Sequence, residues 1–539
     1  MSVAQQTGSW GDQGNGNYNN PVLESNYPDN DVIRVKDTFY MMSSTIHFLP
    51  GMIILKSKDL VNWEFSNAIM PAPITFDSKF DIGHDFLVSK GTYAGSFGYN
   101  GEYYFAYWCH NIEGSNEGTK KILFSKAKNI EGPWSTPREI TFSNGKSIFS
   151  SDPGVMWDMD TKKAWLACGG MTLGAVRLYQ LSWDGEKLLQ NQDQGIVVTR
   201  DLRGESAKIY KFDGMYYIMN THQRGQSVRE QVINRAKRME GPWESRVVLE
   251  NGNGTDRCPS QGSLLKLDDG SWWFIHQLAR GTPEEKYDGR PQMLEPVVWN
   301  DGWPFIGADT NGNGIGEVVW EHGKPINGFP VTAPATDDDF SKPELGLQWN
   351  WRFNPKMDRW SLSERPGFLR LKSCVSLPTT EKESLKRLPN LIGQRLMGQH
   401  KNVMTSKFDF SGMANGQEGG LHVSAADNNV IGVKKDETGK MHLFFKSDAR
   451  GKIVVRNGIA VNQSDLWLQA KVEKGFATFF YSLDGKNFTS LGDEVRLLAD
   501  HHTPNMVGFY TMNNEEKGHL DIDWFKYDYD GPKGKPQPK

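Results

Sequence analysis

Apolar and polar residues follow one another in short runs along the first 300 positions, and no long helical period interrupts them. Within these runs, a polar turn followed by an aromatic or apolar pair recurs five times at steps of roughly 50 to 65 residues. The second aromatic residues of the five copies are Tyr40, Tyr104, Trp165, Tyr217 and Trp273. This spacing indicates an internal repeat.

Each copy of the repeat predicts strands that are joined by tight turns. Pairs such as Asn100-Gly101 and Asp213-Gly214 favour hairpins, because glycine accepts the positive φ that such turns need. The aromatic residues that follow prefer half-buried positions on a pleated sheet. A unit of this length holds about four strands, the size of one propeller blade. We therefore predict a five-bladed β-propeller over residues 15–322; the alternative is a sandwich with coincidental turn spacing.

The pattern changes after residue 320. Three prolines punctuate residues 323–336, which we predict to be a linker. Further on, Leu466, Leu468 and Ala470 alternate with polar neighbours, as in a half-buried antiparallel strand. The chain is therefore predicted to be all-β, with a β-sandwich over residues 337–530 that packs on the propeller. The alternative for the sandwich is an independent carbohydrate-binding module.

Composition narrows the class of protein. The 539 residues include 61 basic and 65 acidic side chains, which excludes a strongly basic nucleic-acid binder. No apolar run is long enough for a membrane span, and the four cysteines form no CxxC pair that would predict zinc or a disulfide framework. No signal-like segment opens the sequence; we nevertheless favour a periplasmic or secreted location after removal of a leader, and leave a cytoplasmic location and the oligomeric state open.

Candidate catalytic groups come from the same repeat. In a propeller, the first strand of each blade lines the central axis and precedes the hairpin with the aromatic pair. The residues 11 to 13 positions before each second aromatic are Asp29, Tyr93, Asp152, Glu205 and Gln261. Three of the five are acidic, and each acid stands beside Gly, Pro or Ser. Taken singly, each is an ordinary turn or capping residue; together they predict one site at the end of the axis.

Carboxylates that face one another across a small pocket are what glycoside hydrolysis requires. One must be protonated to donate to the leaving oxygen, and another must be ionised to activate water. The 18 tryptophans and the aromatic content of 12% supply surfaces for sugar rings. The rival interpretation is a catalytically silent, lectin-like propeller, but binding alone needs no acid–base pair.

Motifs spread over nearly the whole chain carry a family resemblance. Residues 27–29 (Tyr-Pro-Asp), 57–63 (Ser-Lys-Asp-Leu-Val-Asn-Trp), 301–304 (Asp-Gly-Trp-Pro) and 365–367 (Arg-Pro-Gly) are the most specific of them. In this combination they resemble glycoside hydrolase family 43, in its β-xylosidase and α-L-arabinofuranosidase branch. The resemblance implies an inverting hydrolase on a five-bladed propeller, followed by a concanavalin-like sandwich.

The resemblance also implies roles for individual residues. By match of motif, Asp29 takes the role of general base and Glu205 that of general acid, while Asp152 tunes the pKa of the acid and orients it. Arg290 matches an arginine that contacts the sugar. Phe48 and Gln261 are further expected substrate contacts.

Two departures from the family pattern shape our expectation of cofactor and substrate. Gln261 lies in a segment where many members carry a histidine that helps to hold calcium or water, so we expect no metal site and no required cofactor, with a structural calcium left open. Ile46 and His47 replace the Phe and Glu of many xylosidases. We therefore expect exo-acting removal of α-L-arabinofuranosyl groups, with β-D-xylosyl next, from plant polysaccharide (hemicellulose) or its oligosaccharides; an endo-arabinanase is the alternative.

Two further motifs suggest metals at first sight. Asp309–Gly314 resembles the first half of a calcium loop, but Trp320 stands where an EF-hand needs a bidentate Glu. We expect a polar turn there, with Asn and Gly residues in left-handed conformations. The pair His501-His502 is predicted to lie in an exposed loop.

Overall fold

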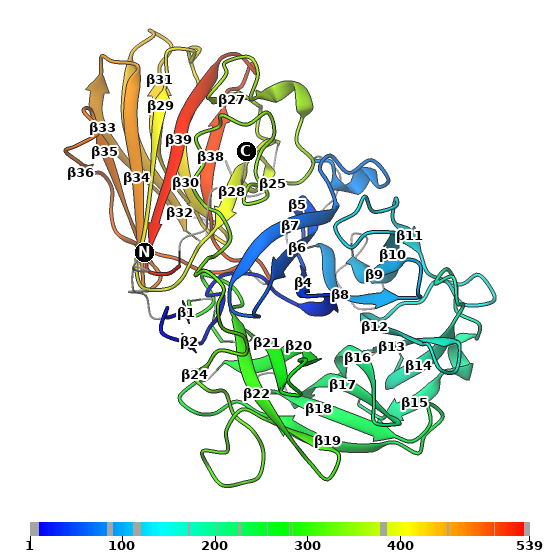
Figure 1. Ribbon diagram of the computed structural model, residues 1–539. Helices are drawn as coiled ribbons and strands as arrows, with labels where there is room; N and C mark the ends of the chain where they lie inside the picture. Colours follow the sequence, from blue (N-terminus) through cyan, green and yellow to red (C-terminus); the bar gives the residue numbers. More distant parts are fainter. Residues whose placement is uncertain are drawn as a thin grey trace.

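The computed structural model describes residues 10–82, 90–111, 120–170, 173–201, 203–224, 228–255, 257–279, 281–282, 284–377, 385–449, 452–500 and 502–532. Over these ranges the chain consists of strands and turns with a few single 3₁₀ turns and no α-helix. No helix there is long and apolar enough to cross a membrane. Figure 1 shows two parts, a ring coloured from blue to green and a layered part coloured from yellow to red.

Five antiparallel sheets of four strands follow one another along the first part of the chain. The first strand of each sheet contacts the first strands of the two neighbouring sheets, so that the five inner strands close a ring. This is the predicted five-bladed propeller. Its strands are β3 (Asp31–Val35), β4 (Thr38–Ser43), β6 (Gly51–Ser57) and β7 (Trp63–Met70) in blade one; β8 (Gly91–Tyr99), β9 (Tyr104–Asn111), β10 (Lys121–Ala127) and β11 (Arg138–Glu139) in blade two; β12 (Ser151–Asp158), β13 (Lys163–Gly169), β14 (Val176–Leu181) and β15 (Ile196–Thr199) in blade three; β16 (Glu205–Phe212), β17 (Met215–Arg224), β18 (Val228–Ala236) and β19 (Glu244–Leu249) in blade four; β20 (Cys258–Lys266), β21 (Trp272–Ala279), β22 (Gln292–Asn300) and β23 (Trp303–Ile306) in blade five.

The aromatic run of the repeat fills the space between blades. Phe105 on β9 stacks on Trp157 of blade three, with ring centroids 4.6 Å apart. In blade four, Phe212 meets Trp272 of blade five edge to face, with centroids 4.5 Å apart. Large aromatic side chains bury much apolar area each, and such pairs add specific geometry to that burial. The repeat is therefore visible in the sequence because each blade must present the same apolar face to the next.

The inner strands share an irregularity at one end. Asp29, Asp152, Ser206 and Gln261 have φ values of 58°, 47°, 67° and 57°, in the left-handed region. Strands β8, β12, β16 and β20 also shift register at this end. A β-bulge re-aims one side chain and increases local twist. The repeated bulge therefore marks the end of the axis at which the predicted acids lie.

The C-terminal part is a sandwich of two large antiparallel sheets. The predicted alternation is confirmed in β34 (Asp465–Glu473), where Leu466, Leu468, Ala470 and Val472 are buried. One sheet has the order β33 (Lys452–Val461), β32 (Met441–Ala449), β31 (Asn428–Lys435), β30 (Glu418–Ser424), β38 (Met506–Met512), β28 (Ile392–Arg395), β25 (Asn350–Arg352) and β5 (Phe48–Leu49). The other has the order β26 (Trp360–Ser361), β27 (Leu369–Lys372), β39 (His519–Tyr529), β29 (Asn402–Asp409), β34, β35 (Phe476–Ser482) and β36 (Thr489–Ser490), with β37 (Val495–Arg496) beside β35.

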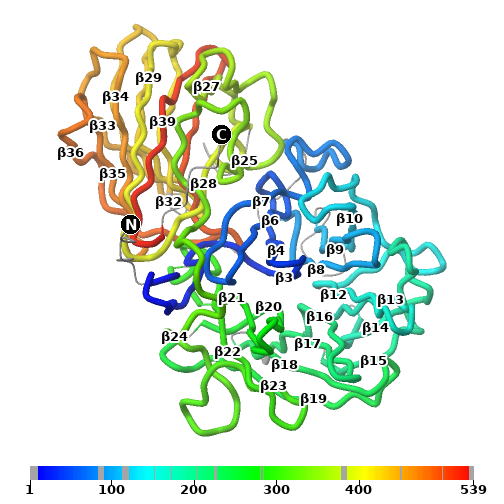
Figure 2. The backbone as a smooth tube through the Cα atoms, viewed as in Figure 1, coloured from blue at the N-terminus to red at the C-terminus, as the bar shows by residue number. Residues whose placement is uncertain are grey.

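Strand β5 joins the two parts, because it leaves blade one and becomes the edge strand of a sandwich sheet. It pairs antiparallel with β25, Phe48 opposite Arg352 and Leu49 opposite Trp351. Figure 2 shows β25 and β28 on the side of the sandwich that faces blade one. One cluster of buried apolar residues also extends through both parts; it includes Tyr27 beside the propeller and Trp349 in the sandwich. The predicted domain limits of 15–322, 323–336 and 337–530 remain predictions.

A small third sheet lies where the chain enters and leaves the ring. It consists of β1 (Gly11–Asp12), β2 (Asn17–Asn19) and β24 (Glu321–Gly323). Next to it, the buried ammonium of Lys324 binds the carboxylates of Asp12 and Asp59, the latter at 2.9 Å. This ion pair ties the segment after the propeller to blade one.

Candidate active site

The three predicted acids come from three blades and meet at one end of the propeller axis. Asp29 lies two residues before the start of β3, Asp152 lies at the start of β12, and Glu205 begins β16. Their proximity shows in the electrostatics, since the charges of Glu205 and Asp29 both raise the pKa of Asp152. The fold therefore brings together the three acids that the repeat spacing predicts.

Asp29 is a buried carboxylate surrounded by donors. The guanidinium of Arg290 donates a 2.6 Å hydrogen bond from Nη1 to Asp29 Oδ1, and Gln277 Nε2 donates to the same oxygen at 3.1 Å. Burial by itself raises the pKa of Asp29, but Arg290 and Gln277, with the more distant charge of Arg229, outweigh it and lower the pKa below its usual value. Asp29 is therefore ionised at neutral pH.

Asp152 has a different set of partners. Gln261 Nε2 donates a 2.7 Å hydrogen bond to its Oδ2, and the Ser206 hydroxyl donates to the same oxygen at 3.3 Å. Its own backbone N–H donates to Cys109 Sγ at 2.9 Å. No arginine forms an ion pair with Asp152 among the contacts of the described residues. Its carboxylate is thus hydrogen-bonded but not neutralised.

The pKa of Asp152 moves in the direction opposite to that of Asp29. Burial and then the negative charge of Glu205 raise it, and Asp29 adds to the effect. The positive charge of Lys120 and the Gln261 hydrogen bond lower it, but the pKa still rises to about 7. Because burial and a neighbouring negative charge both disfavour the ionised form, Asp152 keeps its proton until close to neutral pH.

Glu205 is the most open of the three acids. Its carboxylate binds Arg229 at 2.7 Å, and 18% of its side chain is exposed, against 6% for Asp29. Arg229, on β18, also donates to the Ser260 hydroxyl at 2.9 Å, which fixes the guanidinium from blade five. A carboxyl group that is partly exposed and held in place suits proton transfer to a bound molecule.

A pocket opens in front of the two arginines that bind the acids. Arg229 and Arg290 line it from the propeller, and the sandwich segment between β37 and β38 lines it from the other side. Its lining residues are Asn26, Arg229, Ala279, Lys286, Gly289, Arg290, Ala499, His502, Thr503 and Pro504. The sandwich therefore supplies one wall of the pocket.

The expectation of an exposed His501-His502 loop is wrong for His502, while His501 lies outside the described residues. The His502 ring packs edge to face on Tyr93, with centroids 5.6 Å apart, and lines the pocket. Asn505, three residues on, donates from its backbone and its side chain to the carbonyl of Tyr287, at 2.8 and 3.1 Å. Tyr287 lies three residues before Arg290. These two hydrogen bonds therefore hold the loop that carries Arg290 against the sandwich.

The three predicted substrate contacts fare differently. Arg290 lies at the pocket, where its Nη2 is buried and has no hydrogen-bond partner within the described chain. Gln261 does not line this pocket; its Nε2 donates to Asp152, and its Oε1 is buried without a hydrogen-bond partner among the described residues. Phe48 is in another place: it is 6% exposed, pairs with Arg352 in the seam between the two parts, and is not among the residues that line this pocket. The prediction for Phe48 missed β5, because pairing over 300 residues of sequence leaves no local signal.

Sequence reasoning missed four residues that contact the acids or their neighbours. Gln277 and Thr221 each stand four positions after a second aromatic residue, and Cys109 stands five positions after one. Extending the repeat beyond its aromatic pair would have selected these three. Arg229 has no such signal, because it lies on the third strand of blade four.

The axis beneath the acids holds a buried ammonium. Lys208 Nζ lies 3.5 Å from Asp31 Oδ1 and also donates to the carbonyl of Gly95, and both charged side chains are buried. In the part of the chain that is described, no three His, Cys, Asp or Glu side chains gather as a metal site. The axial residues therefore fit a divalent cation poorly, since an ammonium already stands beside the one axial carboxylate in this layer.

The loop at residues 309–314 forms a polar turn. Asp309 accepts hydrogen bonds from the backbone N–H groups of Gly312, Asn313 and Gly314 at 2.6 to 3.1 Å. Gly312 and Gly314 are left-handed, as expected, whereas Asn311 and Asn313 are not. The Asp309 carboxylate is thus occupied by the turn itself.

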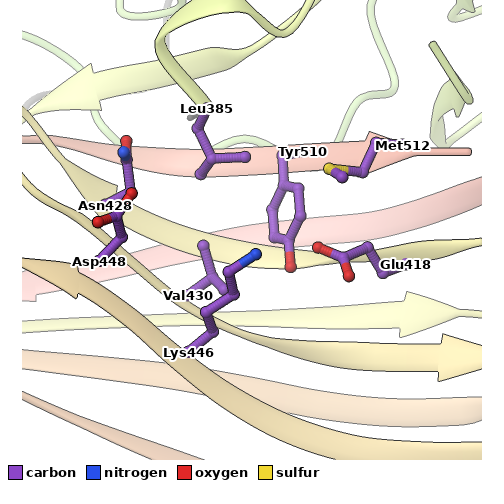
Figure 3. Close-up of a pocket in the computed structure, with 8 residues that line it drawn as sticks. All are labelled: Leu385, Glu418, Asn428, Val430, Lys446, Asp448, Tyr510 and Met512. Atoms are coloured by element: carbon purple, nitrogen blue, oxygen red, sulfur yellow. The ribbon is translucent and has the colours of Figure 1, made fainter. Parts of the chain in front are cut away.

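The sandwich has a hollow of its own, shown in Figure 3. Tyr510 points into it between Glu418 and Lys446, and its volume is about 10 Å³, against about 130 Å³ for the pocket at Arg290. A cavity of this size has room for about one water molecule. This hollow is too small for a sugar ring, so it gives no support to an independent carbohydrate-binding site there.

The chemistry that the site can perform follows from the different protonation states of its carboxyl groups. It combines an ionised aspartate, a second aspartate that keeps its proton until close to neutral pH, and a pocket with unpaired donors. This combination matches hydrolysis of a glycosidic bond by two carboxyl groups with opposite protonation states.

Comparison with known proteins agrees with this chemistry. Residues 18–304 match glycosyl hydrolases family 43, and residues 337–528 match the β-xylosidase C-terminal concanavalin A-like domain. A β-xylosidase of Formosa agariphila is 39% identical over 573 residues, covering 98% of this chain and 93% of the relative. A non-reducing end α-L-arabinofuranosidase of Bacteroides ovatus is 30% identical, covering 80% and 76%.

A solved structure agrees as well. The bifunctional GH43-CE protein of Bacteroides eggerthii superposes with a TM-score of 0.80 at 26% identity, covering 95% of this chain; this chain spans 63% of that longer protein. The chain therefore belongs to glycosyl hydrolases family 43, and it is a glycoside hydrolase.

Proposed function

We propose that this protein is an exo-acting, inverting glycosidase that removes one terminal pentose from plant hemicellulose or its oligosaccharides. The observation that carries the proposal is the opposite pKa shift of two buried aspartates, Asp29 and Asp152, beside a pocket that is lined by the Arg290 bound to Asp29. A silent glycan-binding propeller would have no need to hold one of these aspartates ionised and the other protonated.

In the proposed mechanism, Asp29 takes a proton from a water molecule as the water oxygen bonds to the anomeric carbon. Glu205 gives its proton to the departing glycosidic oxygen as the old C–O bond breaks. Asp152 helps to keep Glu205 protonated and orients it. Arg290 holds Asp29 ionised, and its unpaired Nη2 is suited to donate to a sugar hydroxyl.

The exo mode rests on the wall that the sandwich adds to the pocket. The segment with Ala499, His502 and Pro504 lines one side of the pocket opposite Arg229 and Arg290. A groove for internal cleavage must let a chain pass at both ends, and a wall from a second domain opposes that. The geometry therefore favours chain ends over an endo-arabinanase mode.

For the sugar we propose β-D-xylosyl first. The full-length relative with 39% identity bears the name β-xylosidase, which outweighs the expectation of arabinofuranose from Ile46 and His47. The second candidate is α-L-arabinofuranosyl, because the relative with 30% identity bears that name.

Parallel assays on 4-nitrophenyl β-D-xyloside and 4-nitrophenyl α-L-arabinofuranoside test this proposal, followed by xylo-oligosaccharides labelled at the reducing end. We expect a higher kcat/KM on the xyloside and stepwise loss of single sugars from the unlabelled end. A higher kcat/KM on the arabinofuranoside would favour the second candidate. Absence of hydrolysis of both glycosides, with mid-chain products from arabinan, would contradict the exo proposal.

A further inference from the structure

One contact recurs between neighbouring blades at the end of the axis. The backbone N–H of Asp152 donates to Cys109 Sγ at 2.9 Å. The backbone N–H of Gln261 donates to Thr221 Oγ1 at 3.0 Å. The backbone N–H of Asp29 donates to Gln277 Oε1 at 2.8 Å. In each case a side chain of one blade holds the main chain of the next, which we call an inter-blade bracket.

The three acceptors occupy the same place in their blades. Each stands on the second strand, opposite the residue just before the register shift in the inner strand of its own blade: Cys109 opposite Tyr93, Thr221 opposite Glu205, and Gln277 opposite Ser260. The second strand of one blade therefore fixes the axial residue of the next.

The bracketed residues share an unusual backbone. Asp152, Gln261 and Asp29 are the axial residues with φ values of 47°, 57° and 58°. Non-glycine residues adopt this region only where their surroundings hold them there. All three are buried, so each N–H would lose a necessary partner without its bracket.

We infer that Cys109, Thr221 and Gln277 are positioning residues of this active site: each holds the main chain of an axial residue, and Cys109 and Gln277 also contact the carboxyl group of theirs. The inference rests on the proposed function, because it assigns their effect to the geometry of the proposed base and of the Asp152–Glu205 pair. Cys109 acts on Asp152 directly. Thr221 acts on it through Gln261, whose side chain binds Asp152.

Blade three differs and explains why Glu205 is the more open acid. Gly169 stands at the bracket position of this blade, opposite Ser151. A Cβ there would meet the carbonyl oxygen of Gly204 at 2.2 Å, so the chain before Glu205 needs glycine to pass. Glu205 is then fixed through its carboxylate by Arg229.

The pH profile distinguishes a positioning role from a merely structural one. The titratable groups that face Asp152 are Glu205, Asp29, Lys120 and Cys109. If Asp152 leaves its bracketed position, burial and the charge of Glu205 raise its pKa less, and Asp152 releases its proton at lower pH. The alkaline limb of kcat/KM then moves to lower pH.

The test uses three variants of the full chain. Cys109→Ala removes the acceptor, Cys109→Ser restores one of similar size, and Cys168→Ala is the matched control, a second buried cysteine on the second strand of blade three. We expect Cys109→Ala to lower kcat/KM on the order of tenfold and to shift the alkaline limb downwards by about half a pH unit. Cys109→Ser should recover most of both effects, and Cys168→Ala should leave the limb in place.

An unmoved alkaline limb in Cys109→Ala, or the same loss in Cys109→Ser, would overturn the inference for Cys109. Thr221→Val against Thr221→Ser repeats the test at the second bracket. A crystal structure of Cys109→Ala gives a readout that does not depend on turnover: the inference expects Asp152 to leave the left-handed region, and an unchanged φ would contradict it. Failure of the proposed function would instead show as an inactive wild type with intact brackets.

Discussion

Asp29 and Asp152 occupy equivalent places in two blades but have opposite acid–base properties. Both are buried, left-handed and held by an inter-blade bracket. Arg290 binds Asp29 and lowers its pKa, whereas Asp152 faces Glu205, and its pKa rises to about 7. The difference teaches that the repeat places the carboxylates, while burial and the charged neighbours of each one decide which of them keeps a proton.

The largest effect on turnover is expected from a change at Asp29, the ionised aspartate of the two. Asp29→Asn keeps the shape of the side chain but removes the base, so kcat should fall on the order of a thousandfold or more. Steady-state assays on the nitrophenyl glycoside measure it. Asp37→Asn, at an exposed turn of the same blade, is the control and should retain its turnover. Turnover of Asp29→Asn within tenfold of wild type would remove Asp29 from the role of base.

A second change makes Asp29 resemble Asp152. Arg290→Gln removes the guanidinium that lowers the pKa of Asp29, so its pKa should rise and the base should be protonated over a wider acidic range. We expect the acidic limb of kcat/KM to move to higher pH, with a loss on the order of a hundredfold at pH 5. An acidic limb that stays in place would show that Arg290 does not control the base.

The reverse change neutralises Asp152. Asp152→Asn removes the carboxyl group whose pKa is raised to about 7 and that is proposed to keep the acid Glu205 protonated, so the alkaline limb should move to lower pH. We expect kcat/KM to fall on the order of tenfold at pH 6 and further at pH 8, measured as a full pH profile. A profile that merely scales down, with both limbs unmoved, would contradict the tuning role.

Asp152→Asn should also differ from the wild type in how its stability depends on pH. Folded Asp152 keeps its proton up to about pH 7, whereas an unfolded aspartate releases it near 3.8, so the native state binds more protons between these values. Stability of the wild type therefore falls as pH rises through this window. Each pKa unit corresponds to ~1.4 kcal/mol, so the free energy of unfolding changes by at most ~4 kcal/mol across this window. Asp152→Asn should melt at a higher temperature than wild type at pH 8 but not at pH 4; equal differences at both pH values would contradict this.

The smallest effect is expected from the sandwich. Asn505→Ala removes one of two hydrogen bonds to Tyr287 and loosens the loop that carries Arg290. We expect a few-fold lower kcat/KM and a slight upward shift of the acidic limb, with the alkaline limb unchanged because Asp152 is not in contact with this loop. Movement of the alkaline limb instead would show that the two carboxylate environments are not separate.

Much of the fold could be predicted from local sequence. The five turns with their aromatic runs recur because every blade needs the same hairpin and the same apolar face, and the position of Asp29, Asp152 and Glu205 before these runs follows from the same period. The alternation in β34 was equally visible, because one face of that strand is buried. Periodic features of this kind need no knowledge of distant partners.

The remaining features depend on contacts between distant segments. Strand β5 pairs with β25, and Phe48 therefore lies in a seam and not at the pocket. His502 reaches Tyr93 from the sandwich, which no local pattern indicates. Arg229 binds Glu205 from the third strand of the blade, where the repeat carries no marker. Such contacts are fixed by how sheets dock, and a single sequence does not display them.

Proton NMR of the first sugar released tests the division of labour between the carboxylates most directly. If Asp29 activates water on the face opposite to the leaving oxygen that Glu205 protonates, a β-D-xyloside yields α-xylose first, and the β-anomer appears later by mutarotation. Initial release of β-xylose would mean that a carboxylate attacks the sugar itself, and it would contradict the assignment of Asp29 as the base.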